Sequence, residues 1–274
     1  MKSSCAILLI LISFSCAEKG NEPLTFSVMG DVPRSEVEDS IIQQQIHDHN
    51  DSSNSEFMIH VGDIKDGLSP CEENVYKKVK GYLKKIKVPT FIVPGDNEWN
   101  DCENPETAWG NWVKYFLGFE ENWSSFVDVE RQNIREENFA FNYKGVLIIG
   151  LNLVGGLVHD SLEWKSRHLQ NADWVETRFN KSKDDVRAAV IFAQANLDEK
   201  HISFTERFQE YCCEFKKPVI FIHGDGHTWL YDNPWLEPNL IRIQVDNGGI
   251  APPLQVTVEL NPDSIISFNR NLQL

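Results

Sequence analysis

An α/β fold, in which parallel strands alternate with helices, is what this sequence of 274 residues predicts. Two observations indicate it. From about residue 24 onward, short apolar runs rich in β-branched and aromatic residues alternate with longer amphipathic stretches. Four of the apolar runs are followed by a Gly-Asp pair, which is typical of a turn at the end of a strand.

The first part of the chain contains three strand-like runs and two helix-like stretches. Each strand-like run is short, apolar and followed by turn residues. In the second helical stretch, Val75, Val79 and Leu83 recur at helical spacing and define one apolar face. The predicted elements are strands at residues 24–29, 57–61 and 90–93 and helices at 35–47 and 74–86.

The rest of the chain continues the alternation. A hairpin is expected where two apolar runs are joined by Lys144-Gly145, because Gly provides the positive φ of a tight turn. The predicted elements are hairpin arms at 139–143 and 146–151, helices at 174–179 and 201–215, and strands at 188–192, 218–222, 240–245 and 254–260. Neither a linker nor a fixed-period repeat interrupts them, so residues 23–274 are expected to form a single domain.

The N-terminus, residues 1–22, is predicted to be a signal peptide. Lys2 precedes the apolar run at residues 6–12, which is too short to span a bilayer. Cys16 follows small residues in a manner that resembles a lipoprotein signal, and both lipidation of Cys16 and plain cleavage stay open. We therefore expect an exported protein, whether periplasmic, held at the outer membrane by a lipid anchor, or secreted.

The net charge bears on which partners the chain binds, and the cysteine content bears on which disulfides it forms. The formal net charge is -15 and Lys and Arg form no cluster, which disfavours nucleic-acid binding. Export implies an oxidising compartment, so Cys71 and Cys102, in the loops after two successive strands, are predicted to form a disulfide. The adjacent Cys212 and Cys213 are expected to be free thiols. We expect a monomer that binds a small molecule.

Carboxylates are expected to meet at one edge of the sheet. Ligands of α/β proteins collect outside the carboxyl ends of the strands, where the Gly-Asp pairs fall. Each aspartate alone could be a helix cap or a turn residue. Several carboxylates at one edge would repel one another strongly unless they share a bound cation. The aspartates concerned are Asp31, Asp63, Asp96 and Asp225.

The order of these motifs resembles that of the calcineurin-like metallophosphoesterases. The matching segments are Gly30-Asp31-Val32-Pro33, Gly62-Asp63-Ile64-Lys65, Gly95-Asp96-Asn97-Glu98-Trp99, Ala193-Gln194-Ala195-Asn196 and Gly224-Asp225-Gly226-His227. They extend over nearly all of the chain after the signal peptide and are similar to a divergent exported subgroup of the superfamily. The resemblance implies a four-layer α/β/β/α sandwich with a dinuclear metal site at the strand ends.

The resemblance also implies a set of metal ligands. Asp31 and His227 would hold a first metal, Asp63 would bridge, and Asp96, Asp225 and Gln194 would hold a second. Pro33 stands where the family has a histidine ligand, and carboxylate or amide side chains replace other imidazoles. Hard oxygen ligands favour Mn or Mg, with Ca, Fe or Zn as alternatives and one or two ions per chain.

Further residues near the motifs have candidate roles in binding or proton transfer. Asn97 occupies the place of the family's catalytic histidine but cannot titrate, so His223, His60 and His159 are the candidate proton donors. Trp99 and Trp229 are candidates for an apolar wall against the leaving group. The predicted catalytic residues are Asn97 and His223, and the predicted substrate-binding residues are Lys65, Asn97 and Asn152.

Two functions remain in competition. The first is a metal-dependent phosphoesterase that hydrolyses a small phosphate ester through a metal-activated water. The second is a catalytically degenerate protein on the same fold that retains metal or phosphate binding. An unrelated dinucleotide-binding fold is disfavoured, because no G-x-G-x-x-G follows a strand.

Overall fold

The computed structural model describes residues 22–124, 126–261 and 264–270. The predicted signal peptide, including Cys16, lies outside these residues except for Glu22. None of the helices within the described ranges combines the length and the apolar character needed to cross a bilayer.

Five strands form the first sheet, in the order β12-β11-β1-β2-β3. The three strands β1, β2 and β3 are parallel, whereas β11 runs antiparallel to β1 and β12 antiparallel to β11. The strands are β1 (Leu24–Met29), β2 (Met58–His60), β3 (Thr90–Ile92), β11 (Leu254–Asn261) and β12 (Ser264–Asn269). The last two strands of the chain therefore return to pair with its first strand.

Seven strands form the second sheet, in the order β4-β5-β6-β7-β8-β10-β9. Its centre, β6-β7-β8-β10, is parallel, and its remaining strands are antiparallel to their neighbours. The strands are β4 (Glu130–Gln132), β5 (Arg135–Tyr143), β6 (Val146–Gly150), β7 (Ala188–Phe192), β8 (Val219–His223), β9 (Leu230–Asp232) and β10 (Leu240–Gln244).

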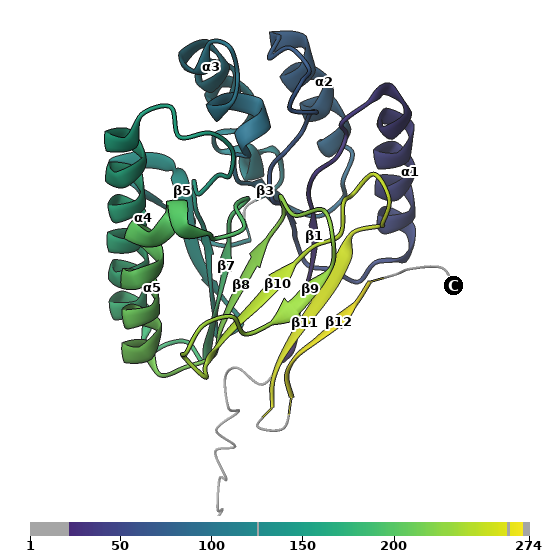
Figure 1. Cartoon of the computed structure of the whole chain (residues 1–274). Coiled ribbons are helices and arrows are strands. Elements are labelled where there is room, and N and C mark those ends of the chain that lie inside the picture. Colours follow the sequence, from purple (N-terminus) through teal and green to yellow (C-terminus); the bar gives the residue numbers. More distant parts are fainter. Residues whose placement is uncertain (1–21, 125, 262–263, 271–274) are drawn as a thin grey trace, which may run out of the picture.

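Helices cover the outer faces of both sheets (Figure 1). Three lie against the first sheet, namely α1 (Glu36–Ser52), α2 (Glu73–Leu83) and α3 (Pro105–Phe116), and two against the second, namely α4 (Ser161–Ser182) and α5 (Ile202–Phe215). Short helical turns are η1 (Asp96–Asn100), η2 (Phe119–Asn122) and η3 (Glu199–His201). The predicted α/β fold with a four-layer α/β/β/α arrangement is confirmed.

Three apolar cores hold the four layers of the sandwich together. Side chains alternate across a strand, so consecutive residues of β7 enter different cores. Val190 and Phe192 face the first sheet and pack with Phe26, whereas Ile191 faces the helices and packs with Phe208. On the outer side of the first sheet, a third core forms under α1, α2 and α3. Strands buried on both faces account for the continuous apolar runs in the sequence.

Some elements were not predicted from the sequence. The helix α3 has recognisable signals, because Asn104 caps it by accepting from the Thr107 N–H and Pro105 occupies its first turn. Its buried residues Ala108, Trp112 and Phe116 are spaced by four. The strands β4, β9 and β12 were also missed, and the helix predicted at 174–179 lies in the C-terminal half of the 22-residue α4.

Cys71 and Cys102 are joined by a disulfide with a Cα–Cα distance of 6.0 Å. It connects the loop after β2 to the segment after η1, and both sulfurs lie 3.6 Å from the carbonyl oxygen of Asn97. Cys212 and Cys213 are free, the first buried and the second exposed. The disulfide therefore restrains the segment that carries Asn97.

Removing this disulfide should destabilise the protein. The two cysteines are 31 residues apart in the sequence. A disulfide that closes a loop of this length stabilises the folded state by about 3–4 kcal/mol, because it restricts the unfolded chain. We expect the Cys71→Ser/Cys102→Ser double variant to melt several degrees below the wild type in calorimetry. Cys213→Ser is the matched control, because this thiol is exposed and free. Equal melting of the double variant and the wild type would contradict the prediction.

Candidate metal and active site

Four aspartates stand just after strands, where the sequence predicts them. Asp31 follows β1, Asp63 follows β2, Asp96 follows β3 and Asp225 follows β8. Asp31, Asp63 and Asp225 have φ angles of 55°, 60° and 65°, in the left-handed region that is unfavourable for residues other than Gly. Such backbone conformations persist where surrounding structure enforces them, and they gather at functional sites.

Side chains from distant parts of the chain form two overlapping groups that could hold a metal ion. Asp31, Asp63 and His227 make one group, and Asp63, Asp96 and Asp225 make the other. In each group, the candidate ligand atoms lie within 4.8 Å of one another. Asp63 belongs to both groups, which is the sharing that the sequence motifs predict for it. We call these five residues the carboxylate cluster.

Close backbone packing explains two glycines at the cluster. A Cβ built on Gly95 would lie 2.2 Å from Asp63 Oδ1, so a side chain there would displace that carboxylate. Gly62 has a φ of 87°, and its Cβ would lie 2.6 Å from the amide nitrogen of Gly95. Glycine is therefore required where the loops after β2 and β3 touch.

Burial and mutual repulsion perturb the carboxylates. Burial, together with the neighbouring Asp96, Glu98 and Asp31, raises the pKa of Asp63 well above its usual range. Burial and then Asp225 raise the pKa of Asp96 to about 6. The pKa of Asp225 is raised mainly by burial and also by Asp31. Without a cation, the cluster therefore resists carrying its full negative charge.

The donor set fits a divalent cation. Asp31 Oδ2 is buried without a hydrogen-bond partner, although it belongs to a side chain of the cluster. An unpaired buried carboxylate oxygen is costly, and a cation would satisfy it. Four of the five side chains offer oxygen, which suits hard cations better than a thiolate or all-imidazole site would.

Glu98, Asn97 and Lys65 hold the loops around Asp63. The buried Glu98 carboxylate accepts from the Gly95 N–H at 2.6 Å and the Asp63 N–H at 3.1 Å, and burial raises the pKa of Glu98 to about 7. Asn97 Nδ2 donates to Asp63 Oδ2 at 2.9 Å. Lys65 Nζ donates to the carbonyls of Asp66 and Asn97 at 2.7 Å each. Phosphate binding by Lys65 or Asn97 stays a prediction.

Gln194 and His227 contact the cluster in different ways. Gln194 Nε2 donates to Asp96 Oδ1 at 2.8 Å, and its Oε1 accepts from the Gly155 N–H at 2.7 Å. In this orientation Gln194 presents a donor to the carboxylates, so its predicted role as a ligand stays a prediction. His227 Nε2 lies 3.1 Å from Asp31 Oδ1, and this hydrogen bond raises the pKa of His227.

His223 and Asn152 belong to neither group of the carboxylate cluster. His223 is fully buried, its Nδ1 contacts the carbonyl oxygen of Gly224 at 2.9 Å, and burial lowers its pKa to about 3. The His223 ring is inaccessible in this structure, and its predicted catalytic role stays a prediction. Asn152 is also buried, and its Nδ2 donates to Glu137 at 2.8 Å. His60, the third histidine considered, is buried and contacts the Val32 carbonyl oxygen.

Two residues near the cluster were missed by sequence reasoning. Arg34 Nη1 lies 3.1 Å from His227 Nε2, and Arg34 directly follows Pro33, where the motif departs from the family pattern. Asp101 raises the pKa of Asp96 through its charge. The sequence signal for Asp101 is its position at the end of η1, next to Cys102. His159, a candidate proton donor, lies 3.5 Å from Asp101 Oδ1.

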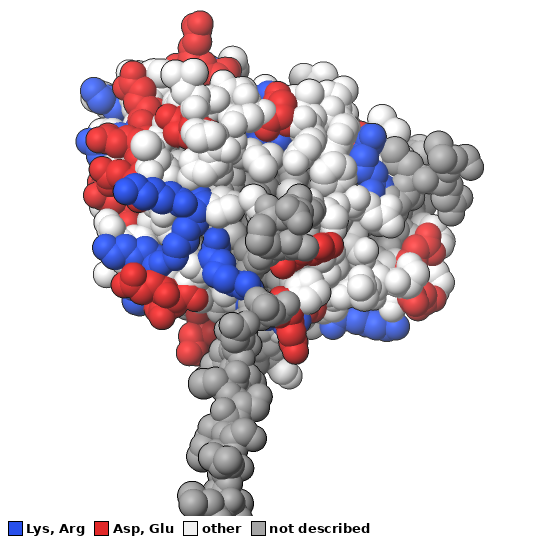
Figure 2. Space-filling model, turned by 90° about the horizontal axis from the view of Figure 1, so that it is seen from below, with Lys and Arg blue, Asp and Glu red and all other residues white. Residues whose placement is uncertain are grey.

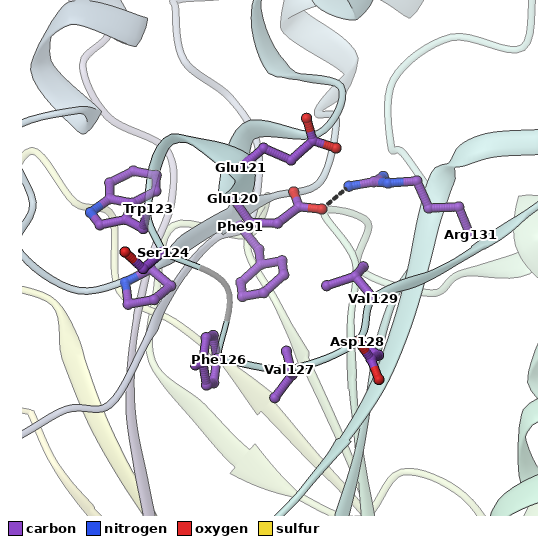
Figure 3. Close-up of a pocket in the computed structure, with 11 residues that line it drawn as sticks. Phe91, Glu120, Glu121, Trp123, Ser124, Phe126, Val127, Asp128, Val129 and Arg131 are labelled. Atoms are coloured by element: carbon purple, nitrogen blue, oxygen red, sulfur yellow. Dashed lines mark hydrogen bonds and ion pairs between the residues drawn. The ribbon is translucent and has the colours of Figure 1, made fainter.

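Charged side chains on one face of the molecule and a cavity lined by aromatic rings lie away from the carboxylate cluster. Lys and Arg side chains lie beside Asp and Glu side chains on the face seen from below in Figure 2. A cavity of about 420 Å³ lies at the opposite end of β3 from Asp96. Phe91 and Phe126 line it, and its Glu120 is paired with Arg131 (Figure 3). The aromatic lining and this ion pair distinguish it from the carboxylate cluster.

Comparison with known proteins decides the family. The family model described as calcineurin-like phosphoesterase matches residues 25–229, which include every residue of the cluster. The chain belongs to the calcineurin-like phosphoesterase family. The resemblance seen in the motifs is thereby confirmed. None of the curated proteins compared with this family member matches it in sequence.

Solved structures of other proteins share the fold at low sequence identity. Purple acid phosphatase PPD1 from yellow lupin, Lupinus luteus, has a TM-score of 0.60 and 10% identity, over 91% of this chain and 52% of its own. The 5'-nucleotidase from Candida albicans has a TM-score of 0.53 and 14% identity, over 89% and 51%. GAP50, the anchor in the inner membrane complex of Plasmodium, has a TM-score of 0.56 and 9% identity, over 90% and 88%. The chain spans about half the length of the first two.

Proposed function

We propose that this chain is a metal-dependent phosphoesterase that hydrolyses a small phosphate ester, with Mn or Mg as the bound cation. The observation that carries the proposal is Asp63, whose carboxylate belongs to both groups of the cluster. A divalent cation in such a site supplies Lewis-acid stabilisation of the phosphoryl oxygens and lowers the pKa of a water. In the reaction, the water oxygen bonds to phosphorus, the ester P–O bond breaks, and the alcohol leaves with a proton.

In the proposed reaction, different residues bind the cations, position these ligands and orient the phosphoryl group. Asp31 and His227 would hold one cation, Asp96 and Asp225 another, and Asp63 would contribute to both. Glu98 fixes the backbone of Asp63 and Gly95 through its hydrogen bonds, so the ligands keep their positions when substrate enters. Asn97 and Arg34 offer N–H donors beside the cluster, and donors of this kind can orient a phosphoryl group.

Phosphate release is the direct test of this function. The purified chain should release phosphate from 4-nitrophenyl phosphate in the presence of Mn²⁺ or Mg²⁺. The protein should first be shown to be folded by calorimetry. Folded protein that turns over no phosphate ester with any divalent cation would contradict the proposal.

His159 is the residue that we propose as proton donor to the leaving alcohol. Its side chain is exposed, in contrast to the buried His60 and His223, and its Nε2 lies 3.5 Å from Asp101 Oδ1. Asp101 in turn lies beside Asp96 of the cluster. Histidine is the side chain that most often transfers a proton to or from a reacting group.

Replacing His159 should affect esters according to their leaving group. We expect His159→Gln to lower kcat for an alkyl phosphate by about a hundredfold, since an alkoxide needs a proton to leave. The effect on 4-nitrophenyl phosphate should be much smaller, because nitrophenolate leaves without one. His47→Gln is the matched control, since His47 is likewise exposed and lies 3.6 Å from an aspartate, Asp51. Equal loss for both esters would argue against proton donation.

We also propose that the chain is exported, as a periplasmic protein, an outer-membrane lipoprotein or a secreted protein. The apolar segment at residues 6–12 supports this, as does the Cys71–Cys102 disulfide, because disulfides persist mainly in oxidising compartments. Fractionation of cells that express the full chain, with mass spectrometry of its N-terminus, tests export and lipidation of Cys16 together.

A catalytically degenerate binding protein is the second candidate function. It is favoured by the single histidine in the cluster, by Pro33 in place of a histidine ligand, and by Asn97 in place of the family's catalytic histidine. GAP50, which shares the fold, is described as an anchor. This function predicts that a divalent cation raises the melting temperature while no phosphate ester is hydrolysed.

A further inference from the structure

We propose that an apolar pocket beside the carboxylate cluster receives the alcohol part of the phosphate ester, and that the preferred substrates are esters of apolar aryl or alkyl alcohols. This inference rests on the proposed function. The pocket has a volume of about 490 Å³ and is lined by indole rings of Trp99, Trp109 and Trp164, together with Pro105 and Ile134. We call it the Trp99 pocket.

The wall of the Trp99 pocket is built before any ligand binds. Trp99 packs on Trp109 with ring centroids 4.9 Å apart, and Trp109 stacks on Trp112 at 5.2 Å. The fully buried Arg167 lies over both Trp99 and Trp164, at 4.9 and 5.0 Å from the ring centroids. Because these rings are already fixed, a ligand would lose little free energy in ordering them.

The pocket adjoins the carboxylate cluster through η1 and the loop that precedes α4. Trp99 lies on η1, the same short helix as Asp96. A Cβ built on Gly156 would lie 2.5 Å from Asp101 Oδ2 and 2.6 Å from Asp96 Oδ2, so these two carboxylates are neighbours. His159, which lines the pocket, lies 3.5 Å from Asp101. A molecule with its phosphate at the cluster would thus have its alcohol part next to this pocket.

One exposed apolar side chain lines the pocket, and two others belong to segments that adjoin its lining. Ile134 in its lining is 66% exposed, and Leu162, in the first turn of α4, is 78% exposed. Leu157 is also exposed, and its carbonyl oxygen accepts from Asn100 of the pocket wall. Exposed apolar side chains next to a pocket are consistent with a site that binds an apolar group.

The charges of the lining exclude an anionic alcohol part. The lining contains Glu106, Glu137, Asp160 and Glu163 but only one Arg or Lys, Arg135. Arg135 lies 3.3 Å from Glu163 and 3.5 Å from Glu137, so its charge is largely offset. A leaving group that carries another phosphate, such as a nucleoside phosphate, would be repelled here, whereas an uncharged aryl or alkyl group would not.

Substrate preference in an Ile134 variant is the first test. For wild type with Mn²⁺, kcat/KM should be at least about tenfold higher for 2-naphthyl phosphate than for glycerol phosphate or ADP. Ile134→Asp should lower the ratio of naphthyl to glycerol ester by about tenfold. Leu236→Asp is the matched control, since Leu236 is 94% exposed and does not line the pocket, and it should leave the ratio unchanged. If the ratio is unchanged in Ile134→Asp, the role proposed for the Trp99 pocket is wrong, whereas the proposed phosphoesterase activity is not affected.

Binding of 2-naphthol alone is the second test, and it needs no turnover. Saturation-transfer NMR should show contact between the wild type and 2-naphthol, and a loss of that contact in Ile134→Asp but not in Leu236→Asp. If 2-naphthol does not bind to the wild type, the role proposed for the Trp99 pocket is wrong. If 2-naphthol binds as expected but no ester is hydrolysed, the proposed function fails, and with it the assignment of the pocket to a leaving group.

Discussion

Replacing Asp63 by asparagine is expected to reduce phosphate release from 4-nitrophenyl phosphate by at least about a thousandfold, which corresponds to about 4 kcal/mol in the activation barrier. Asp63 is the one residue shared by both groups of the carboxylate cluster, so its loss weakens both at once. Asparagine has the same shape and can still accept from Asn97 Nδ2 through its amide oxygen. Folding should therefore be preserved, and calorimetry checks this.

Asp66→Asn is the control for this experiment. Asp66 lies three residues further along the same loop, belongs to neither group of the cluster, and is paired with Arg34 at 3.5 Å. Its replacement should leave turnover within a few-fold of the wild type. Asp63→Asn protein that is folded and hydrolyses the ester at a rate close to the wild type would contradict the proposed role of the cluster.

The metal-free protein is expected to lose stability as the pH rises from about 4 to 7. Folding raises the pKa of Asp96 to about 6 and that of Glu98 to about 7, chiefly through burial. The stability that their protonation confers is complete below about pH 4 and is lost as the pH rises through these values. Each shift corresponds to roughly 3 kcal/mol at about 1.4 kcal/mol per pH unit, and the combined effect is smaller than the sum because the groups interact.

Melting temperatures measured between pH 5 and 8 test this expectation. After treatment with a chelator, the wild type should melt at a lower temperature at pH 8 than at pH 5.5, and Mn²⁺ should raise the melting temperature most at pH 8. The Asp63→Asn/Asp96→Asn double variant should show a flatter dependence, since two of the repelling charges are gone. Identical pH profiles for the double variant and the wild type would show that the cluster is not the cause.

Much of the fold was accessible from the sequence, because its parallel strands are buried on both faces. Runs such as residues 188–192 are apolar at every position and are bounded by turns, so both their strand character and their central place in a sheet could be predicted. The pairing of β11 with β1 could not, since more than 220 residues separate the partners Leu24 and Val258 and no local signal records the register.

The candidate site was predictable where it depends on strand ends and was missed where it depends on loops. Asp31, Asp63 and Asp225 follow strand ends within one to three residues, so the convergence of carboxylates could be inferred before the structure was known. Asp101 and His159 come together because the loop before α4 folds over η1, a tertiary contact with no local pattern. The roles predicted for Gln194 and His223 stay predictions, since adjacency to a motif does not determine which atom a side chain presents.

Metal content is the measurement that tests the central claim most directly, because the claim is that buried carboxylates from β1, β2, β3 and β8 lie together by sharing divalent cations. Equilibrium dialysis of the folded chain against Mn²⁺ at pH 7.5, followed by elemental analysis, should give one or two ions per chain. Asp63→Asn should bind fewer, and Asp66→Asn should match the wild type. Folded wild-type protein that retains no divalent cation, or Asp63→Asn protein that retains the full number, would contradict the account.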